Sequence, residues 1–534
     1  MVNRFSARTP LMSALRRGFR QAALSYRPLN GFPGPRGNPA GPPPGSGSGP
    51  VSASRRGFVK GALALGAAAL VPGCRPKSGD GPRIAIVGAG IAGLQAVHTL
   101  AKGGLAAEVF EAGDRAGGRI LTLQNLVGPG LWTEAGGEFI DSSHEDMLGL
   151  AKEFGIPILD ALGGDLAGLV GNAWMFGGRA RSEAEVAAAV RDAAGPIALD
   201  IGALPDMVSA GVGGKAAELD RIPLSEYLDL RGVTGWLREL IIAAYAGEFG
   251  LDADRQSCLN LLTMVSLDVS AGRFEVFGES DERYRLQGGN MALTGAMAAR
   301  YADRIRFGHR LEAVEARGRG FRLSFRTPGG PKETVADAVI LTLPFTLLRG
   351  TDLRVDLPPV QRKAIAELGY GTNSKLFLGY SARPWRAAGY SGTFFTGDLI
   401  QNGWDHTRTQ PGPAGGITVF QGGAAGLELG KQSPGTLAEK FSQAVDRMFP
   451  GSHAVRNGKQ GAFHWPTYPW SLGSYACYEP GQWTAFAGEE GRPAGNLYFA
   501  GEHCSRDFQG YMNGGAETGR RAAEAILDKS KTSR

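Results

Sequence analysis

The chain has 534 residues, 43% of them hydrophobic and 20% charged, which is ordinary for a globular protein of two or three domains. Its 82 glycines follow no three-residue period, which excludes a collagen-like structure. The net charge of +6 comes from the first 77 residues, which hold 12 Lys and Arg and no Asp or Glu, whereas the rest holds 45 basic and 51 acidic side chains. Because this body lacks basic clusters, we expect no nucleic-acid partner.

The first 53 residues do not have the composition of a folded domain. Residues 28–50 are rich in Pro, Gly and Ser and cannot bury enough apolar surface to offset chain entropy. Residues 1–53 are therefore predicted to be a disordered leader. The alternative is a start assigned too far upstream, with translation beginning at Val51.

An arginine pair and a short apolar run follow at residues 54–77. Residues 54–60 read SRRGFVK, and the apolar run has about 11 residues, against roughly 20 for a helix that spans a bilayer. The motif resembles the twin-arginine export signal, which directs folded proteins out of the cytoplasm. Residues 70–74, LVPGC, resemble a lipobox, although the proline is atypical. We expect a periplasmic or extracellular protein whose membrane attachment, if any, is a lipid on Cys74.

The chain then shows a strand, a glycine-rich turn and a helix in succession. Residues 83–87, RIAIV, are typical of a buried parallel strand, the next six residues read GAGIAG, and residues 94–102 have a helical pattern. Gly88 allows the tight turn, Gly90 lets a pyrophosphate approach the backbone, and Gly93 lets the helix pack on the strand. The free N–H groups at the start of the helix would face the phosphates.

A second strand, residues 108–111, ends in a carboxylate that completes this pattern. Glu111 lies 23 residues after Gly88, in position to bind ribose hydroxyls. The next residues, 112–119, read AGDRAGGR. They resemble the segment that continues the fingerprint in FAD enzymes of the glutathione-reductase superfamily, and in particular in the flavin-containing amine oxidase family. An arginine there can neutralise the pyrophosphate, and Arg119 is the better candidate.

The resemblance extends over about residues 82–530 through motifs in the family's order. They occupy residues 134–140, 286–293, 309–314, 338–344, 497–502 and 510–516. The resemblance implies a Gly-Gly loop beside the flavin ring, a main chain that pairs with adenine, a carboxylate that binds the ribityl chain, and a last helix that begins against the flavin. The corresponding residues are Gly136, Gly137, Leu311, Gly501, Glu502 and Met512.

This order of motifs implies an α/β fold with two interleaved domains. The FAD-binding domain, Rossmann-like and of the glutathione-reductase type, would comprise residues 80–158, 286–365 and 468–530. Residues 159–285 and 366–467 would form a mixed α+β substrate domain. The active site would lie at the seam between the two domains.

Four residues fall where the family has its catalytic machinery. Lys375, in the strand-like run 373–378, would hold a water against flavin N5 and aid oxygen reduction, although a lone strand lysine is otherwise a solvated surface residue. Trp465 would pack beside the ring system. Tyr475 and Tyr511 would flank the substrate nitrogen, as aromatic rings recognise cations, and their alternative role is core packing.

Four cysteines occur in the chain, Cys74, Cys258, Cys477 and Cys504, and none lies in a CxxC pair or a Cys/His cluster with metal-ligand spacing. We therefore expect packed or free thiols and no metal site. Ser474 falls where mitochondrial monoamine oxidases carry the cysteine bonded to the flavin, and Cys477 is three residues out of register. The FAD is therefore predicted to be non-covalent.

The resemblance implies oxidation of an amine to an imine by hydride transfer to flavin N5, with dioxygen reduced to hydrogen peroxide. An L-amino acid oxidase of the same family is the first alternative. A flavin-dependent desaturase and an exported flavin-binding protein without turnover are further alternatives, and Lys375 with the two tyrosines argues against the desaturase. The sequence does not indicate an oligomeric state.

The choice between an amine and an L-amino acid depends on a partner for the α-carboxylate, which is usually an arginine. The loop after Gly137 continues EFIDSSH, with acids and no arginine. Glu138 would repel a carboxylate, and it could either meet a second positive group of the substrate or make a structural hydrogen bond. The sequence favours an amine, but Arg273, Arg283 or Arg285 could reach the pocket from another segment.

Overall fold

The computed structural model describes residues 81–278 and 280–532. The leader, the twin-arginine motif and Cys74 lie outside the described residues, so export and lipidation stay predictions. Within the described ranges, no helix combines the length and the apolar character that a membrane span requires.

A five-stranded parallel sheet with the order β20-β13-β1-β2-β9 is the central layer of one half of the molecule. Its central strand, β1 (Ile84–Val87), is buried along its whole length, as an apolar strand between two parallel neighbours must be. The other strands are β2 (Ala107–Phe110), β9 (Ile305–Arg306), β13 (Ala338–Leu341) and β20 (Leu497–Phe499). This sheet confirms the predicted α/β, Rossmann-like fold.

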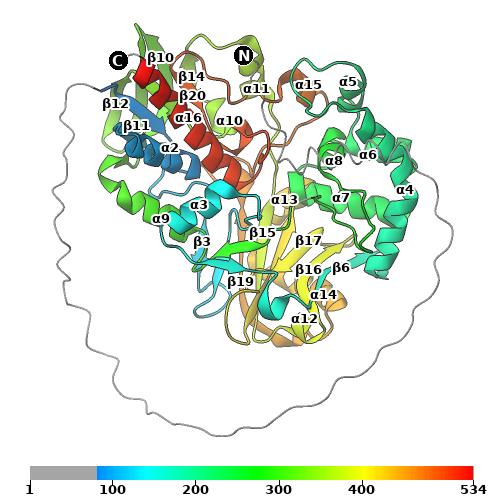
Figure 1. Ribbon diagram of the computed structural model, residues 1–534. Coiled ribbons are helices and arrows are strands. Elements are labelled where there is room, and N and C mark those ends of the chain that lie inside the picture. The colour runs from blue at the N-terminus through cyan, green and yellow to red at the C-terminus, as the bar shows by residue number, and fades with distance from the viewer. Residues whose placement is uncertain (1–80, 279, 533–534) are drawn as a thin grey trace, which may run out of the picture.

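Two helices pack on one face of this sheet, α2 (Ile91–Lys102) and α16 (Met512–Thr532), as Figure 1 shows. Glycines allow the close contacts. A Cβ on Gly93 would lie 1.9 Å from the carbonyl oxygen of Gly88, and a Cβ on Gly519 would lie 2.1 Å from that of Ala92. The first contact fixes α2 on the turn that follows β1, which is the role predicted for Gly93.

A second, four-stranded sheet packs on the opposite face of the parallel sheet, with the order β12-β11-β10-β14. Side chains of β1 alternate between the two layers: Ile84 and Ile86 face α2 and α16, whereas Ala85 and Val87 face the four-stranded sheet. The strands are β10 (Arg310–Arg317), β11 (Gly320–Thr327), β12 (Gly330–Ala336) and β14 (Asp352–Arg354).

The other half of the molecule contains a seven-stranded mixed sheet with the order β19-β15-β18-β17-β16-β6-β7. Helices α12 (Pro384–Ala387), α13 (Gly423–Leu429) and α14 (Pro434–Met448) accompany it, and Figure 1 shows them below the parallel sheet. The strands are β6 (Val170–Phe176), β7 (Arg179–Arg181), β15 (Ser374–Tyr380), β16 (Tyr390–Thr396), β17 (Asn402–Asp405), β18 (Gly415–Gln421) and β19 (Arg456–His464).

A helical subdomain with its own apolar core lies beside this sheet, at the right of Figure 1. Its longest helix, α4 (Glu183–Ala203), begins with a capping box in which Ser182 and Glu185 bind each other's backbone N–H groups. The other helices are α5 (Gly214–Asp220), α6 (Leu224–Leu230), α7 (Gly235–Phe249) and α8 (Leu259–Met264). The end of α7 reaches the interior of the molecule and supplies part of the site described below.

The chain passes repeatedly between these layers. The parallel and four-stranded sheets are built from the segments predicted to bind FAD, and the seven-stranded sheet from those predicted to bind substrate; the boundaries themselves stay predictions. The remaining elements are β3 (Thr122–Gln124), β4 (Trp132–Glu134), β5 (Ile158–Asp160), β8 (Tyr284–Leu286), α3 (Glu145–Glu153), α9 (Met291–Arg300), α10 (Phe345–Leu348), α11 (Pro359–Glu367) and α15 (Gln482–Phe486), with short 3-10 turns between them.

Candidate active site

A cavity of about 560 Å³ lies between the two halves of the molecule. Residues at the carboxyl ends of the parallel strands line one part of it, among them Val87 and Phe110. Residues of the seven-stranded sheet and of α7 line another part, among them Lys375 and Glu248. The carboxyl edge of a parallel sheet is where α/β proteins bind ligands, so this cavity is the candidate site.

The glycine-rich turn presents a bare backbone to the cavity. Gly88 has φ +105°, a conformation that favours glycine, and it leads from β1 into the turn. No side chain caps the start of α2 at Gly90, and the nearest atom to a Cβ on Gly90 would be the Cα of Gly118 at 3.8 Å. A helix N-terminus without a cap attracts anions, so this part of the cavity suits a pyrophosphate.

Glu111 holds the turn in place. One carboxylate oxygen accepts the backbone N–H of Ala89 at 2.7 Å, and the other accepts that of Gly113 at 2.8 Å. Leu311 also lines the cavity near this end of the sheet. The proposed contacts of Glu111 with ribose and of Leu311 with adenine stay predictions, and the structure adds that the carboxylate organises the loop.

Arg119 and Glu502 form an ion pair at the cavity wall. Arg119 Nη1 lies 2.7 Å from Glu502 Oε1 and also donates to the carbonyl of Ser474 at 2.8 Å. Glu502 Oε2 accepts the backbone N–H of Gly510 at 2.9 Å. The pair thus joins three segments that are distant in sequence. Arg115 also lines the cavity, and it donates to the Gly118 carbonyl and to the Tyr468 hydroxyl. Because both arginines reach the cavity, the preference for Arg119 as the partner of the pyrophosphate stays a prediction.

The Gly-Gly loop after β4 lies between the two halves. A Cβ on Gly136 would lie 1.9 Å from the carbonyl oxygen of Arg119, and a Cβ on Gly137 would lie 2.7 Å from Met512 Cγ. The Trp465 indole donates to the carbonyl of Ala135 at 2.9 Å. These glycines are required because the loop is pressed between the start of α16 and the segment that precedes β3.

Lys375 is buried and fully hydrogen-bonded. Its side chain is 5% exposed, and Nζ donates to the carbonyls of Glu134 and Gly136 at 3.0 Å each and to Glu138 Oε2 at 3.2 Å. An ammonium has three N–H donors, so all three are used. This burial excludes the alternative of a solvated surface lysine. A water bound to Lys375, which the resemblance implies, would have to replace one of the three acceptors.

Tyr475 and Tyr511 are both anchored at the carboxyl end of α7. The Tyr475 hydroxyl donates to the carbonyl of Gly247 at 3.0 Å, and the Tyr511 hydroxyl donates to Glu248 Oε1 at 3.2 Å. Both residues line the cavity, and burial raises the pKa of both phenols well above the usual value, so both stay neutral. Their role around a substrate nitrogen stays a prediction, but both rings border the space where it would bind.

The chain matches the family model described as flavin-containing amine oxidoreductase over residues 91–527. It belongs to this family. A protein of Mycobacterium tuberculosis provisionally named flavin-containing monoamine oxidase AofH is 27% identical, over 83% of this chain and 96% of that protein. An L-amino acid dehydrogenase of Synechocystis is 24% identical, over 83% of this chain and 94% of its own length. The structure of cyclohexylamine oxidase from Brevibacterium oxydans has a TM-score of 0.73 at 21% identity, over 84% and 99% of the two chains.

As a flavin-containing amine oxidoreductase, the protein binds FAD, which supplies the acceptor for the hydride removed from the carbon that bears the nitrogen. The residues present fit this cofactor. The uncapped start of α2 and the bare Gly90 suit its pyrophosphate, and the glycines of the Gly-Gly loop leave a backbone surface where a side chain would project. Three of the cavity residues predicted for its other parts, Glu502, Trp465 and Met512, line the same continuous space.

The three described cysteines lie away from this flavoenzyme cavity. Cys258, Cys477 and Cys504 are buried, and none is among the residues that line the cavity. The Cys477 thiol instead lies 3.5 Å from the Asn260 amide nitrogen. Ser474 lines the cavity in its place, and its hydroxyl donates to Asn373 Oδ1 at 2.6 Å. This arrangement supports non-covalent FAD.

Glu138 does not offer a free negative charge to a substrate, although it lines the cavity, so of the two roles that the sequence left open the contact with a substrate cation is not supported. Its two oxygens accept from Lys375 at 3.2 Å and from the Trp404 indole at 2.9 Å, and Arg285 Nε lies 3.7 Å away. The alternative, a structural role, is what the structure shows. The carboxylate is the counter-charge of Lys375, and a local sequence could not reveal this because Lys375 and Trp404 lie more than 200 residues further along the chain.

The three candidate arginines for a substrate carboxylate do not line the cavity. Arg273 pairs with Glu275 and Arg283 with Asp160, both at the surface. Arg285 is 4% exposed and lies over the Phe139 ring, behind the cavity wall.

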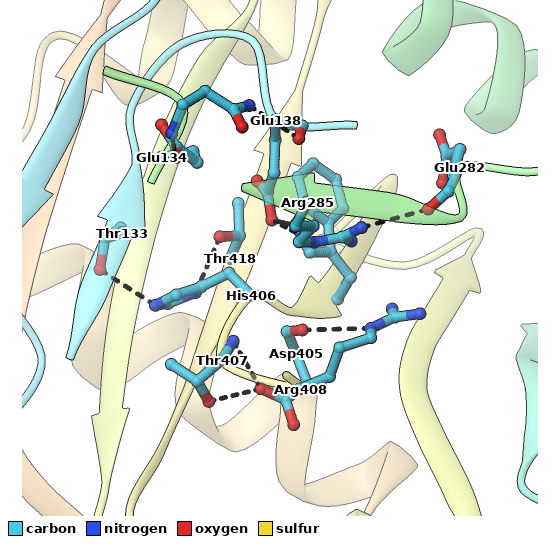
Figure 2. A network of polar contacts seen from close by, with 12 residues as sticks. Thr133, Glu134, Glu138, Glu282, Arg285, Asp405, His406, Thr407, Arg408 and Thr418 are labelled. Atoms are coloured by element: carbon cyan, nitrogen blue, oxygen red, sulfur yellow. Dashed lines mark hydrogen bonds and ion pairs between the residues drawn. The ribbon is translucent and has the colours of Figure 1, made fainter. Parts of the chain in front are cut away.

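Arg285 belongs to a buried polar network behind the cavity wall, which Figure 2 shows. There, His406 lies 3.1 Å from the Thr133 hydroxyl and 3.0 Å from the Thr418 hydroxyl. Burial lowers the pKa of His406 to about 4, so the imidazole is neutral at physiological pH.

Two carboxylates of the cavity wall were missed at the level of sequence, Glu248 and Glu282. Burial raises the pKa of Glu248 to about 7 and that of Glu282 to about 8. Glu248 could have been found as the single acid in the apolar helix end AAYAGEF, whereas Glu282 lies in the charged run SDERYR and gives no signal. The aromatic residues Trp404 and Phe420 were missed as well. Their ring centroids lie 5.2 and 5.7 Å from Lys375 Nζ.

Proposed function

We propose that this flavin-containing amine oxidoreductase acts on amines that lack an α-carboxylate and uses dioxygen as its electron acceptor. The observation that carries the proposal is the charge of the cavity wall in the half formed by α7 and the seven-stranded sheet. Glu248 and Glu282 line that half, and Arg273, Arg283 and Arg285 do not.

The cation of that half, Lys375, does not provide a carboxylate site. Its charge is matched by Glu138 at 3.2 Å, and its other two N–H donors are held by backbone carbonyls. Above about pH 8, where Glu248 and Glu282 are ionised, a substrate carboxylate beside them would meet like charges. None of the three candidate arginines lines the cavity to pair with that carboxylate, and an unpaired charge is costly in a buried site. An ammonium group is attracted by the same carboxylates.

Anaerobic reduction of the bound flavin tests the proposal. Tyramine should reduce the flavin faster than tyrosine, and agmatine faster than arginine, because each amine differs from its amino acid only by the carboxylate. A preference for either amino acid over its amine would overturn the proposal and favour an L-amino acid oxidase. If neither amines nor amino acids reduce the flavin, the result would favour the alternative of a flavin-binding protein without turnover.

The use of dioxygen is tested with the same substrates in air. Consumption of oxygen and formation of hydrogen peroxide should match the amine consumed. Fast anaerobic reduction followed by slow reoxidation in air would contradict the oxidase assignment and indicate another electron acceptor. Acid precipitation should leave the FAD in the supernatant, and yellow retained in the pellet would show a covalent bond.

Export is a separate proposal, which rests on residues 54–74 alone. We propose that the folded flavoprotein leaves the cytoplasm by the twin-arginine route, since FAD would be bound before export. Replacing Arg55 and Arg56 with lysine should retain the protein in the cytoplasm of a host with this pathway. Membrane release by Cys74→Ser would support lipidation, and unchanged fractionation would contradict it. A peptide from residues 1–50 in the unprocessed precursor would exclude a start at Val51.

A further inference from the structure

Glu248 lies beside the tyrosine pair, at the end of α7. Its Oε1 accepts the Tyr511 hydroxyl at 3.2 Å, and the preceding residue, Gly247, accepts the Tyr475 hydroxyl at 3.0 Å. The hydroxyls of both tyrosines are therefore directed to one helix end, and the carboxylate lies next to the space that the two rings border. Glu248 itself lines the cavity.

Glu282 reaches the same cavity from the loop before β8. Its backbone N–H donates to Asp141 Oδ1 at 3.0 Å, and its carbonyl accepts Arg285 Nη1 at 3.1 Å. Figure 2 shows that the Arg285 contact reaches the main chain of Glu282. Among the described residues, the carboxylate has no hydrogen-bond or ion-pair partner, although it lines the cavity. The backbone is thus fixed on both sides, and the carboxylate is available to a ligand.

The charged and titratable groups around this pair come from several elements. Asp141 adds negative charge near both carboxylates, while Arg285 and Arg408 add positive charge near Glu282. Tyr511, Tyr475 and Tyr245 face Glu248 as neutral phenols. Burial is the largest influence, and it raises the pKa of Glu248 to about 7 and that of Glu282 to about 8.

We infer that Glu248 and Glu282 receive the substrate as an ammonium cation and accept one of its protons, so that the neutral amine is delivered between Tyr475 and Tyr511. The inference rests on the proposed function in that it assigns a role at the same cavity. In the step, an N–H bond of the ammonium breaks, an O–H bond forms on a carboxylate, and the nitrogen retains the electron pair. No oxidant or reductant takes part.

The acid strengths of the groups explain why two buried carboxylates are suited to accept a proton from the substrate ammonium. An alkylammonium has a pKa near that of lysine, about 10, so well below pH 9 almost all of the substrate arrives protonated. An ordinary carboxylate, with a pKa of about 4, would be about six units too weak a base. The two buried carboxyls are much closer to the ammonium in acid strength, and burial of the ammonium in the same cavity narrows the gap further.

The test is the pH dependence of anaerobic flavin reduction by tyramine in the wild type, Glu248→Gln, Glu282→Gln and the double variant. In the wild type the rate should change little between pH 8 and pH 10. In the double variant it should fall about tenfold for each pH unit below the pKa of the amine, to roughly 100-fold below wild type at pH 8. At pH 10.5, where the substrate is already neutral, it should approach the wild-type rate.

Glu275→Gln is the matched control, because this exposed glutamate pairs with Arg273 at the surface and does not line the cavity. It should follow the wild-type profile. A double variant that is slower by the same factor at every pH would show a structural role and overturn the inference. Wild-type rates in the double variant at pH 8 would also overturn it.

Binding without turnover gives a second readout. Neither tert-butylamine nor tetramethylammonium is oxidised. tert-Butylamine has no C–H bond on the carbon that bears nitrogen, and the nitrogen of tetramethylammonium has no N–H bond and no lone pair. Calorimetry on the holoenzyme should show that both cations bind more tightly at pH 8.5 than at pH 6. The double variant should lose about tenfold or more in affinity and most of this pH dependence. Equal affinities in both proteins would overturn the inference.

Failure of this inference and failure of the proposed function give different results. Faster reduction by tyrosine than by tyramine overturns the proposed function, while a pH-dependent defect in the double variant would still support the ammonium site. Faster reduction by tyramine than by tyrosine supports the proposed function. If the double variant then reduces its flavin more slowly than wild type by the same factor at every pH, the proton-accepting role is overturned.

Discussion

The two ends of the cavity are built in different ways. At the end formed by the parallel sheet, the glycines of the turn and of the Gly-Gly loop expose the backbone to the cavity. The ion pair of Arg119 with Glu502 in this wall is neutralised within the protein. At the end formed by α7 and the seven-stranded sheet, the wall consists of side chains from distant segments, including the carboxylates Glu248 and Glu282. The first end is suited to hold one fixed cofactor, whereas the second can be changed residue by residue to select a substrate.

The largest effect is expected from a methyl group added at the backbone-built end. In Gly93→Ala, the Cβ would lie 1.9 Å from the carbonyl oxygen of Gly88, so the helix must shift from the sheet, at a cost of about 3 kcal/mol or more. Soluble protein should be scarce and without FAD. The control is Gly295→Ala, in the exposed face of α9, where a Cβ meets no atom within 4 Å and should stabilise the helix by about 0.5–1 kcal/mol.

Solubility, FAD content and urea unfolding measure this contrast. Equal stability of the two glycine variants would contradict the view that the parallel-sheet end depends on bare backbone.

Lys375→Met tests the charged centre of the other end. Removal of the lysine leaves Glu138 buried without its nearest cation, which costs about 3–5 kcal/mol of stability. We also expect slower reoxidation of the reduced flavin by oxygen, with anaerobic reduction less affected. The double variant Lys375→Met/Glu138→Gln should recover stability but not the oxygen reaction.

Stopped-flow mixing with oxygen and urea unfolding separate these two roles of the lysine. Lys431→Met, at an exposed lysine paired with Glu428, is the control. If the double variant recovered the wild-type rate of flavin reoxidation by oxygen, Lys375 would act only as a structural partner of Glu138.

The tyrosine pair should have a smaller effect, confined to the reductive half-reaction. Tyr475→Leu and Tyr511→Leu each remove a ring that borders the substrate space, worth about 0.5–2 kcal/mol for an aromatic contact with an amine, or about 2- to 30-fold in rate. Tyr→Phe variants keep the ring and should lose less. Anaerobic stopped-flow reduction of the flavin by tyramine measures the effect. Unchanged rates in the leucine variants would show that both tyrosines serve only in core packing.

A separate comparison, made on stability rather than on rate, concerns two buried histidines, one behind each end. His406 lies within hydrogen-bond distance of two threonine hydroxyls, whereas His503 has no partner for either ring nitrogen among the described residues. His406→Leu leaves both hydroxyls without this partner and should cost about 1–3 kcal/mol more than His503→Leu. Urea unfolding at pH 7.5 measures the difference, and equal losses would contradict it.

The same histidines predict how the free energy of unfolding changes with pH. Burial lowers the pKa of both from 6.5 to about 4, so between these values the unfolded chain binds more protons than the folded one. Their contribution to stability is complete above about pH 6.5 and is lost as the pH falls towards 4. Relative to wild type, each leucine variant should lose less stability between pH 7.5 and pH 5. A loss equal to that of the wild type would show that the histidine is not buried in its neutral form.

The sequence predicted the sheet, the cofactor and the family, because these depend on local patterns. The strand, turn and helix around GAGIAG are contiguous, and each glycine has a steric reason that spacing alone can suggest. The structure places Gly88, Glu111, Arg119, Glu502, Trp465, Tyr475, Tyr511 and Lys375 around one cavity, as expected, while their individual roles stay predictions. For Glu138 the sequence left two roles open and could not decide between them, because its partners Lys375 and Trp404 are far away in sequence.

The sequence by itself determined the backbone-built end of this protein, since a close approach of main chain to main chain requires glycine at fixed positions in one segment. Only the tertiary structure decided the charge of the other end. Lys375 cancels Glu138, Arg285 lies behind the wall, and Glu248 and Glu282 come together from a helix end and a loop more than 30 residues apart. Electrostatic pairing depends on distances in space and on burial, and neither can be read from the order of residues in the chain.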